Sequence, residues 1–378
     1  MTGQSDTERR ETVVIGGGQA GLAVGYYLKQ AGRSFVILEA GARIGDAWRS
    51  RWDGLRLFTP ARYDGLPGMA FPASPHSFPT KDQVADYLET YAAEMRLPVR
   101  TGIRVSGLWP SEPGDGFVIA AGRRHFRAAQ VVVTTGAYRR PRVPDFATEL
   151  DPEITQLHSS EYRNPSQLRD GAVLVVGASN SGAEVAMTTV PGHRTVLAGP
   201  DKGKMPLRPE SRLARWFDIG FWFFVNRVAT LDTPIGRKAM PFVRDHGGPL
   251  ERIWPADLAA AGVERTIARA VAARNGLPVL DDGRVLDVAN VVWCTGFRPD
   301  FGWIHGLDAI AEDGWPRQVR GVVPGVPGLY FVGMPFLHSG GSALLGGVGR
   351  DARHVVESMA HLPRPMTTVI ASETATAR

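Results

Sequence analysis

The 378-residue sequence contains a single cysteine, Cys294. One cysteine excludes an intramolecular disulfide and a C-x-x-C pair, and with them a reductase that works through its own dithiol. Lysine is also scarce: the chain has 5 lysines and 38 arginines, and these cations form no dense run. The net charge of +5 is therefore only mildly basic. This argues against a nucleic-acid partner and favours anionic ligands.

The sequence has no apolar run long enough to cross a membrane. The most apolar stretch, residues 213–228, is too short and is interrupted by Asp218, Asn226 and Arg227. We interpret it as a buried or interface helix, with a tunnel wall or a weak membrane-surface contact as alternatives. The polar N-terminus does not resemble a signal peptide, so we expect a cytoplasmic protein. A homodimer is left open, and no metal-ligand cluster is present.

What the sequence does contain is a dinucleotide-binding pattern in residues 12–39. A β-branched strand is followed by a G-x-G-x-x-G turn, a helix and a second strand that ends at Glu39. Gly16 allows the tight turn, Gly18 lets a diphosphate approach the backbone, and Gly21 lets the helix pack close to the strand. The helix N-terminus attracts the phosphates, and Glu39 is placed to accept the ribose hydroxyls.

The same pattern returns at residues 172–198. A buried strand precedes Gly177-Ala178-Ser179-Asn180-Ser181-Gly182, and a helix and a strand ending at Ala198 follow. Neither an acid nor an arginine stands directly at that strand end, but Lys202 and Lys204 lie just beyond. As mobile cations they are candidates to bind the 2′-phosphate of NADPH, or else ordinary surface lysines. We therefore expect NADPH to be preferred modestly, with NADH also accepted.

Other elements follow from local patterns. A capping box at Thr80–Gln83 predicts a helix to about Met95. The remaining expectations are strands at 99–108, 117–121, 124–126, 129–133, 291–293 and 328–333, a closing helix at 343–357 and a loose C-terminal tail. With 378 residues, of which 43% are hydrophobic, two globular domains are expected.

Taken together, the motifs resemble those of the flavin-containing monooxygenases, in the compact bacterial and plant YUCCA-like branch. The matching segments are GGGQAGL (16–22), GDAWRSRWDGLRLFTP (45–60), FPTKDQVADYLETYA (78–92), HSSEYRNP (158–165), GASNSGAE (177–184), WCTGFRP (293–299) and GLYFVG (328–333). The resemblance implies an α/β fold with two Rossmann-like domains, the nicotinamide domain being inserted into the FAD domain. The expected boundaries are 1–165 and 293–378 for FAD and 166–292 for NAD(P)H.

The resemblance and the two glycine motifs together imply two sets of cofactor contacts. The FAD set is Gly16, Gly18, Gln19, Ala20, Gly21, Glu39, Ala40, Gly45, Trp48, Arg49, Leu57, Thr59, Val105, Thr135, Gly136, Gly333 and Leu344. The NAD(P)H set is Gly177, Ser179, Asn180, Ser181, Gly182, Glu184, Lys202, Lys204, Thr295 and Gly296.

The implied activity is an NAD(P)H-dependent flavin monooxygenase. Nicotinamide would reduce FAD, O2 would form a C4a-(hydro)peroxyflavin, and a small-molecule nitrogen, sulfur or carbonyl centre would be oxygenated. Such chemistry needs no protein nucleophile. His158, Asp46 and His338 are the polar candidates for a catalytic role, and a structural role is the alternative for each.

Two departures from the family pattern keep a second activity open. Pro152 and Ile154 stand where the family signature has Phe and Gly, and no asparagine occurs between Thr59 and Arg62. The alternative is a flavin-dependent NAD(P)H oxidase or dehydrogenase without a stable oxygenated intermediate. A flavin-binding protein without enzymatic activity would not need the second glycine motif.

Overall fold

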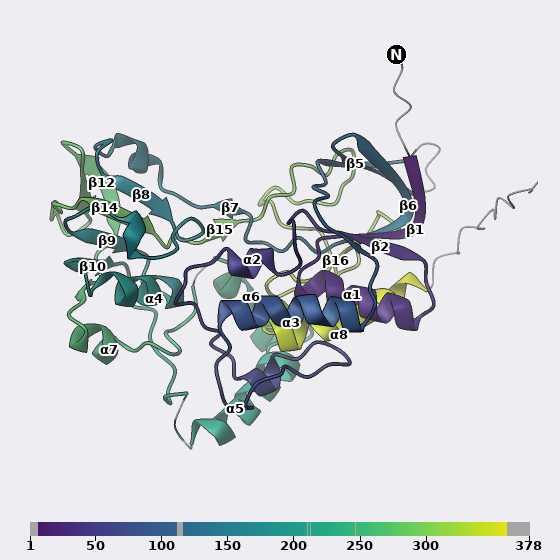
Figure 1. Cartoon of the computed structure of the whole chain (residues 1–378), viewed down its shortest axis with the longest axis horizontal. Coiled ribbons are helices and arrows are strands. Elements are labelled where there is room, and N and C mark those ends of the chain that lie inside the picture. Colours follow the sequence, from purple (N-terminus) through teal and green to yellow (C-terminus); the bar gives the residue numbers. More distant parts are fainter. Residues whose placement is uncertain (1–6, 112–115, 210, 212, 246, 361–378) are drawn as a thin grey trace, which may run out of the picture.

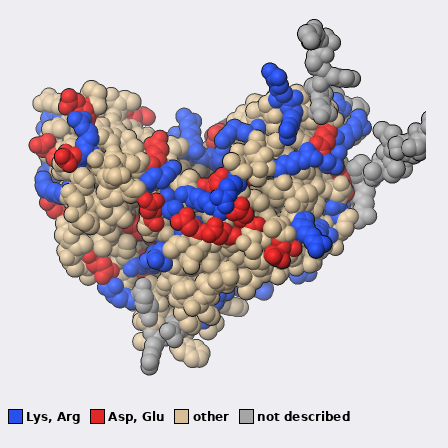
Figure 2. All heavy atoms as spheres, in the orientation of Figure 1, with Lys and Arg blue, Asp and Glu red and all other residues tan. Residues whose placement is uncertain are grey.

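The protein is described by a computed structural model that covers residues 7–111, 116–209, 211, 213–245 and 247–360. Two lobes, each built on a mainly parallel sheet, lie side by side in Figure 1. The expected α/β class is therefore confirmed. A space-filling view shows a notch between the lobes, with Lys and Arg side chains along it (Figure 2).

The first lobe contains a seven-stranded sheet. Its strands, in spatial order, are β3 (Val99–Arg100), β2 (Phe35–Leu38), β1 (Thr7–Ile15), β6 (Arg124–Val133), β5 (Phe117–Ala121) and β4 (Gly107–Pro110), and β16 (Leu329–Phe331) also pairs with β6. The pairs β1–β2, β1–β6, β2–β3 and β6–β16 are parallel, whereas β4, β5 and β6 form an antiparallel meander. The C-terminal strand thus returns to the sheet that the N-terminal strand began.

Three helices cover this sheet on one face: α1 (Gln19–Gln30), α3 (Lys81–Glu94) and α8 (Leu345–Met359) (Figure 1). Helix α3 begins at the predicted capping box, because the Thr80 hydroxyl accepts from the Gln83 N–H and the Gln83 side chain accepts from the Thr80 N–H. Apolar side chains of all three helices share one core with β1, β2 and β6.

The second lobe contains a five-stranded parallel sheet. Its order is β11 (Glu264–Thr266), β10 (Thr195–Ala198), β9 (Val173–Val176), β14 (Asn290–Trp293) and β8 (Thr155–His158), and it carries α4 (Asn180–Thr189), α7 (Pro255–Ala260) and the hairpin β12 (Ala270–Arg274)–β13 (Leu277–Leu280). The order β11–β10–β9 is that of a mononucleotide-binding βαβαβ unit, and β14 and β8 extend the sheet by two strands. Since β8 belongs to this sheet, the second lobe starts before the expected boundary at residue 166.

Two of the segments that connect the lobes pair with each other. Strand β7 (Arg140–Pro141) leaves the first lobe, β15 (Phe297–Arg298) returns to it, and the two form a short antiparallel ladder. The first lobe is therefore interrupted in sequence by the second. Short helices occur in the connections at α2 (Asp46–Arg49), η1 (Ala61–Tyr63), η2 (Asp145–Glu149) and η3 (Pro165–Gln167).

Residues 214–245 contain α5 (Ala214–Phe223), the π-helical turn η4 (Phe224–Val228) and α6 (Pro234–Asp245). In Figure 1, α5 lies below the two sheets and α6 is labelled beside α3. Of the predicted buried or interface helix, the buried alternative is wrong, because Trp216 is 79% exposed and Phe223 62% exposed. The interface alternative stays a prediction. Trp222 of α5 nevertheless stacks on Tyr63 of the first lobe, with the ring centroids 4.8 Å apart. None of the helices in the described part of the chain has the length and apolar character needed to span a bilayer.

Two strand predictions also need correction. Residues 124–133 form one strand instead of two, since β1 starts at Thr7 and pairs with β6 from His125 to Val133. Conversely, residues 99–108 do not form one strand, because β3 ends at Arg100 and β4 begins at Gly107. The closing helix is confirmed, and the tail beyond residue 360 lies outside the described residues.

Candidate functional site

The first glycine turn has the geometry of an anion-binding site. Gly16 has a φ of +113°, and a Cβ on Gly21 would lie 1.9 Å from the Gly16 carbonyl oxygen, so turn and helix are in contact. A Cβ on Gly18, in contrast, would meet nothing within 4 Å. Helix α1 has no side-chain cap and no acid in its first turn. Its free N–H groups therefore border open space, as a diphosphate requires.

Glu39 lies beside this turn at the end of β2. Its Oε2 accepts from the Gly17 N–H and its Oε1 from the Gly41 N–H, both at 2.6 Å. The carboxylate is thus fixed at the strand end, and each oxygen keeps a lone pair. This position suits the two ribose hydroxyls of a dinucleotide.

Residues near the C-terminus complete the first site. Gly333 has a φ of +84°, and a Cβ there would lie 2.6 Å from the Ala20 Cβ. The Gln19 side chain donates to the Ala343 carbonyl at 3.3 Å, just before Leu344 and the start of α8. Helix α8 likewise has no side-chain cap and no acid in its first turn. The structure therefore brings two uncapped helix N-termini together across more than 300 residues of sequence.

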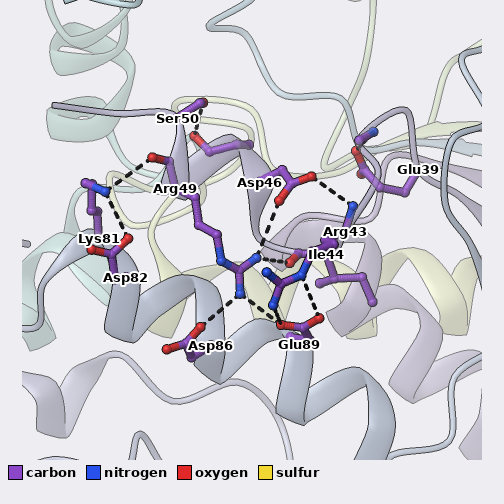
Figure 3. Close-up of polar contacts among 12 residues, drawn as sticks. Glu39, Arg43, Ile44, Asp46, Arg49, Ser50, Lys81, Asp82, Asp86 and Glu89 are labelled. Atoms are coloured by element: carbon purple, nitrogen blue, oxygen red, sulfur yellow. Dashed lines mark hydrogen bonds and ion pairs between the residues drawn. The ribbon is translucent and has the colours of Figure 1, made fainter. Parts of the chain in front are cut away.

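The segment expected to cover the flavin is held on α3 by Arg49. This guanidinium donates to the Ile44 carbonyl at 2.7 Å and to Asp86 and Glu89 at 2.9 Å each (Figure 3). Asp46 accepts from the Arg43 N–H at 2.8 Å. The charged ends of Arg49 and Asp46 thus help to fix the loop, and a catalytic role of Asp46 stays a prediction.

Thr59 lies beside a buried carboxyl. Its hydroxyl donates to Asp64 Oδ1 at 2.5 Å, while Asp64 Oδ2 is buried with no hydrogen-bond partner among the described residues. Burial raises the pKa of Asp64 to about 7, although the Thr59 hydrogen bond opposes the shift. Leu57 is buried in the same lobe. Val105 packs against the other face of the sheet.

A shallow, largely open pocket of about 360 Å³ lies beside the start of α8. Tyr63, Leu66, Trp222 and Gly346 are among its lining residues, and the Tyr63 and Trp222 rings stack with centroids 4.8 Å apart. A Cβ on Gly346 would lie 1.7 Å from the Tyr63 carbonyl oxygen, so η1 and α8 are in direct contact. The cavity thus joins the 59–70 loop, α5 and the uncapped end of α8.

The second glycine turn repeats the contacts of the first. Gly177 has a φ of +106°, and a Cβ on Gly182 would lie 1.7 Å from the Gly177 carbonyl oxygen. At the middle position, however, the Ser179 hydroxyl donates to the Gly248 carbonyl at 2.8 Å. Asn180 donates to the Pro249 carbonyl at 3.0 Å. Residues 248–249 are therefore bound to the start of α4, where the family fingerprint has an open glycine.

Two expected NAD(P)H contacts are engaged elsewhere. The Glu184 carboxyl accepts from Trp52 Nε1 at 3.0 Å and lies 3.5 Å from Arg252, and burial raises its pKa to about 7. Lys204 Nζ lies 4.1 Å above the Trp254 ring. Glu184 therefore joins the two lobes through Trp52, and Lys204 is held by a cation–π contact.

Gly136 and Gly296 mark the ends of β6 and β14, one in each lobe. They have φ values of +71° and +83°, and a Cβ on either would meet nothing within 4 Å. The Thr135 hydroxyl is buried without a partner among the described residues, and the Thr295 hydroxyl donates to the Arg142 carbonyl. Both strand ends leave room for a ligand.

The two histidine candidates differ in their contacts. His158 contacts the Gly296 carbonyl at 3.0 Å through Nε2 and the Ser160 hydroxyl at 2.8 Å through Nδ1, so both nitrogens are engaged. His338 Nδ1 is buried without a partner among the described residues, and its Nε2 lies 3.7 Å from Asp232. Burial lowers the pKa of both imidazoles. Of these two histidines, only His338 has a ring nitrogen available to bind a ligand or a proton.

The sequence pattern missed Asp64 and Arg265. Asp64 is a lone acid in a loop, and only the fold shows that it is buried. Arg265 lies on β11, beside the end of β10, and donates to the Leu197 carbonyl at 3.3 Å. Arg265 could have been predicted from the sequence only if the pairing of β10 with β11 had been known. Among the described residues, no cluster of three or more His, Cys, Asp or Glu side chains could hold a metal ion.

Comparison with known proteins agrees with this geometry. A family profile described as Pyridine nucleotide-disulphide oxidoreductase matches residues 13–217. The chain belongs to this family. Its single cysteine has no second thiol to pair with, and burial raises the pKa of the Cys294 thiol to about 12. This member of the family therefore has no pair of cysteines that could form an internal dithiol.

Individual relatives narrow the family to its flavin monooxygenases. An oxidoreductase of Geobacillus kaustophilus (strain HTA426), named uncharacterized oxidoreductase CzcO-like, is 37% identical over 92% of this chain and 98% of its own length. The Arabidopsis thaliana protein named probable indole-3-pyruvate monooxygenase YUCCA3 is 28% identical over 92% of this chain and 86% of its own length. The solved flavin-containing monooxygenase from Stenotrophomonas maltophilia is 29% identical over 93% of this chain and 98% of that chain, with a TM-score of 0.74. The protein is an oxidoreductase of the flavin-containing monooxygenase family, as the motifs predicted.

Proposed function

We propose that the protein is an FAD-dependent, NAD(P)H-consuming monooxygenase that transfers one oxygen atom of O2 to a nitrogen, sulfur or carbonyl centre of a small molecule. The observation that carries this proposal is the pair of glycine turns, one per lobe, each in contact with the first turn of its helix. Lys and Arg side chains lie along the notch between the lobes, with Asp and Glu side chains beside them (Figure 2), and these cations would suit two anionic dinucleotides.

The residues of the first lobe fit FAD. The open Gly18, the uncapped α1 N-terminus and Glu39 would hold its diphosphate and ribose. Gly333 and the start of α8 would lie along the rest of the molecule. When bound, FAD would supply the redox chemistry, which includes hydride acceptance and oxygen activation.

The residues of the second lobe would hold the nicotinamide nucleotide. Helix α4 has no side-chain cap and no acid in its first turn. Ser179 and Asn180 donate hydrogen bonds to the carbonyls of residues 248 and 249. When the nucleotide binds, residues 248–249 must therefore either move away or form one wall of its site. Gly296 and Gly136 leave open space at the strand ends that face the crossing between the lobes.

The chain itself would position the substrate and exclude water. The cavity beside Tyr63 and Trp222 is the candidate substrate pocket, since it adjoins the α8 N-terminus. His338 Nδ1 is the candidate for holding a proton. Because some relatives are named indole-3-pyruvate monooxygenases, 2-oxo acids are the first carbonyl substrates to test.

An NAD(P)H oxidase is the second candidate, favoured by one observation. The Thr59 hydroxyl donates its hydrogen bond to Asp64, and residues 59–62 contain no asparagine whose amide could take its place. The two activities are separated by measuring NADPH consumed, product formed and hydrogen peroxide released by the yellow protein. Product equal to NADPH supports the monooxygenase. Peroxide equal to NADPH with every 2-oxo acid, amine and sulfide tried would establish the oxidase instead.

A further inference from the structure

The carboxyl ends of β10 and β11 carry an arginine that no motif assigns. In the register of this parallel pair, Leu197 faces Arg265 and Ala198 faces Thr266. The Arg265 guanidinium donates to the Leu197 carbonyl at 3.3 Å and also to the carbonyl of Thr266. Arg265 therefore lies along the end of β10, although it comes from the neighbouring strand.

Arg265 has no ion-pair partner among the described residues, whereas the arginine next to it does. Arg284 also binds Thr266, through the hydroxyl at 2.5 Å, but its charge is paired with Asp282 Oδ2 at 2.7 Å. Asp201 attracts Arg265 only from beyond ion-pair distance, and burial lowers the pKa of the Arg265 guanidinium. A partly buried arginine with only carbonyl partners keeps N–H donors for an anion.

The position matches one part of a dinucleotide. In this type of fold the adenosine ribose lies at the end of the second strand, where an acid binds the 2′-hydroxyl or an arginine binds the 2′-phosphate. Here the second strand ends at Ala198, and Gly199 follows with a φ of +140°. A Cβ on Gly199 would lie 3.2 Å from the Ala178 N–H nitrogen, so the strand end directly adjoins the second glycine turn.

We propose that Arg265 binds the 2′-phosphate of NADP(H) and sets the preference for NADPH over NADH. The inference rests on the proposed function of the second lobe. A planar guanidinium suits a phosphate better than a mobile ammonium does. Lys204, the alternative from the sequence, is already held on the Trp254 ring, which leaves Lys202 as a secondary contact.

The test compares three variants as FAD-loaded enzymes. Arg265→Gln removes the charge, and Arg265→Lys retains it without the planar fork. Arg194→Gln is the matched control, because Arg194 precedes the other end of β10 and pairs with Glu264 of β11 at 2.7 Å. KM for NADPH and NADH, FAD content and thermal midpoint are measured for each.

Arg265→Gln should raise KM for NADPH by about 10- to 100-fold and leave KM for NADH within about twofold, as expected for loss of a charge-assisted phosphate contact. Arg265→Lys should recover part of this loss, and Arg194→Gln should behave like the wild type. Equal increases with both cofactors, or no increase with either, would overturn the proposal while leaving the monooxygenase function intact.

A binding measurement separates this inference from the proposed function. By calorimetry, the wild type should bind adenosine 2′,5′-bisphosphate at least about tenfold more tightly than adenosine 5′-monophosphate, and Arg265→Gln should abolish the difference. This readout needs no turnover, so it would still support Arg265 if neither cofactor were oxidised and the proposed function failed. Equal binding of the two probes by the wild type would refute the role of Arg265. If Arg265→Gln fails to fold, Arg265→Lys carries the same comparison.

Discussion

Gly18 and Gly21 lie three residues apart in one motif, yet their surroundings are opposite. A Cβ on Gly18 would meet nothing within 4 Å, whereas one on Gly21 would lie 1.9 Å from a backbone oxygen. Packing of α1 on the turn therefore requires a glycine at position 21, whereas packing leaves position 18 free and we expect a bound diphosphate to need the space there. The packing role predicted for Gly21 is confirmed, because it depends only on the local strand–turn–helix geometry. The diphosphate contact predicted for Gly18 stays a prediction.

This difference predicts two distinct outcomes. Gly18→Val should fold with a thermal midpoint near that of a wild-type apoprotein, but should purify without yellow colour, since the side chain would occupy the space of the diphosphate. Gly21→Ala should lower stability by several kcal/mol or prevent folding, because turn and helix cannot separate without loss of packing. Absorbance at 450 nm and thermal melts check both. Full flavin content in Gly18→Val would show that FAD binds elsewhere.

Asp64 makes stability depend on pH in a defined direction. Burial raises its pKa from 3.8 to about 7, so the folded state holds the proton more tightly than the unfolded state. The resulting stability is fully present below pH 3.8 and is lost as the pH rises towards 7. Above pH 7 the ionised, buried carboxylate opposes folding by up to about 4 kcal/mol.

Asp64→Asn keeps the acceptor for Thr59 and removes the titration. At pH 4 the variant and the wild type should have similar free energies of unfolding, and at pH 8 the variant should be more stable. Urea denaturation at the two pH values measures this difference. A wild type that is at least as stable as the variant at pH 8 would show that Asp64 is paired in solution.

At the scale of elements, the predictions that failed depended on distant neighbours. Residues 124–133 became one strand because β1 begins five residues earlier than expected and pairs along its length. Strand β8 joined the second sheet through β14, a partner more than 130 residues away. The binding of residues 248–249 to α4, and the position of Arg265 beside β10, likewise arise from tertiary contacts that no local pattern encodes.

Helix α5 supplies an element-scale prediction through Trp222. This ring stacks on Tyr63 and lines the cavity beside α8, whereas Trp216 on the same helix is 79% exposed. Trp222→Ala should raise KM for the organic substrate by about tenfold and release more peroxide per NADPH, because the pocket becomes larger and wetter.

Trp216→Ala is the matched control and should leave substrate KM and peroxide release unchanged. Both variants should retain FAD and their rate of reduction by NADPH. If Trp216→Ala and Trp222→Ala changed substrate KM equally, the cavity beside Tyr63 would not be the substrate pocket.

At the scale of the molecule, one hydrogen bond joins the lobes at a buried position. Trp52 of the first lobe donates to Glu184 on α4 of the second, with the atoms 3.0 Å apart. Trp52→Phe should remove the donor to Glu184 Oε2, leave only the longer contact from Arg252, and cost about 1–3 kcal/mol of stability. It should also slow flavin reduction by NADPH, because the two lobes are then held less firmly in register.

Trp109→Phe is the control for this prediction, since Trp109 lies on β4 and stacks on His305 within the first lobe. Anaerobic stopped-flow spectroscopy measures the reduction rate, and urea denaturation measures stability. Unchanged reduction and stability in Trp52→Phe would show that the Trp52–Glu184 contact does not fix the lobes relative to each other.

The pairing of β16 with β6 also determines when the protein can mature during synthesis. Phe331 is the register partner of Val133, about 200 residues earlier in the chain. A ribosome adds ~5–20 residues per second, so the N-terminal sheet must wait roughly 10–40 s for its last strand. The second lobe, from β8 to β14, is complete before that strand emerges and can form first. Gly333 and α8 are synthesised later still. We therefore expect the cofactor to bind only after synthesis of the chain is nearly complete, as the last step of folding.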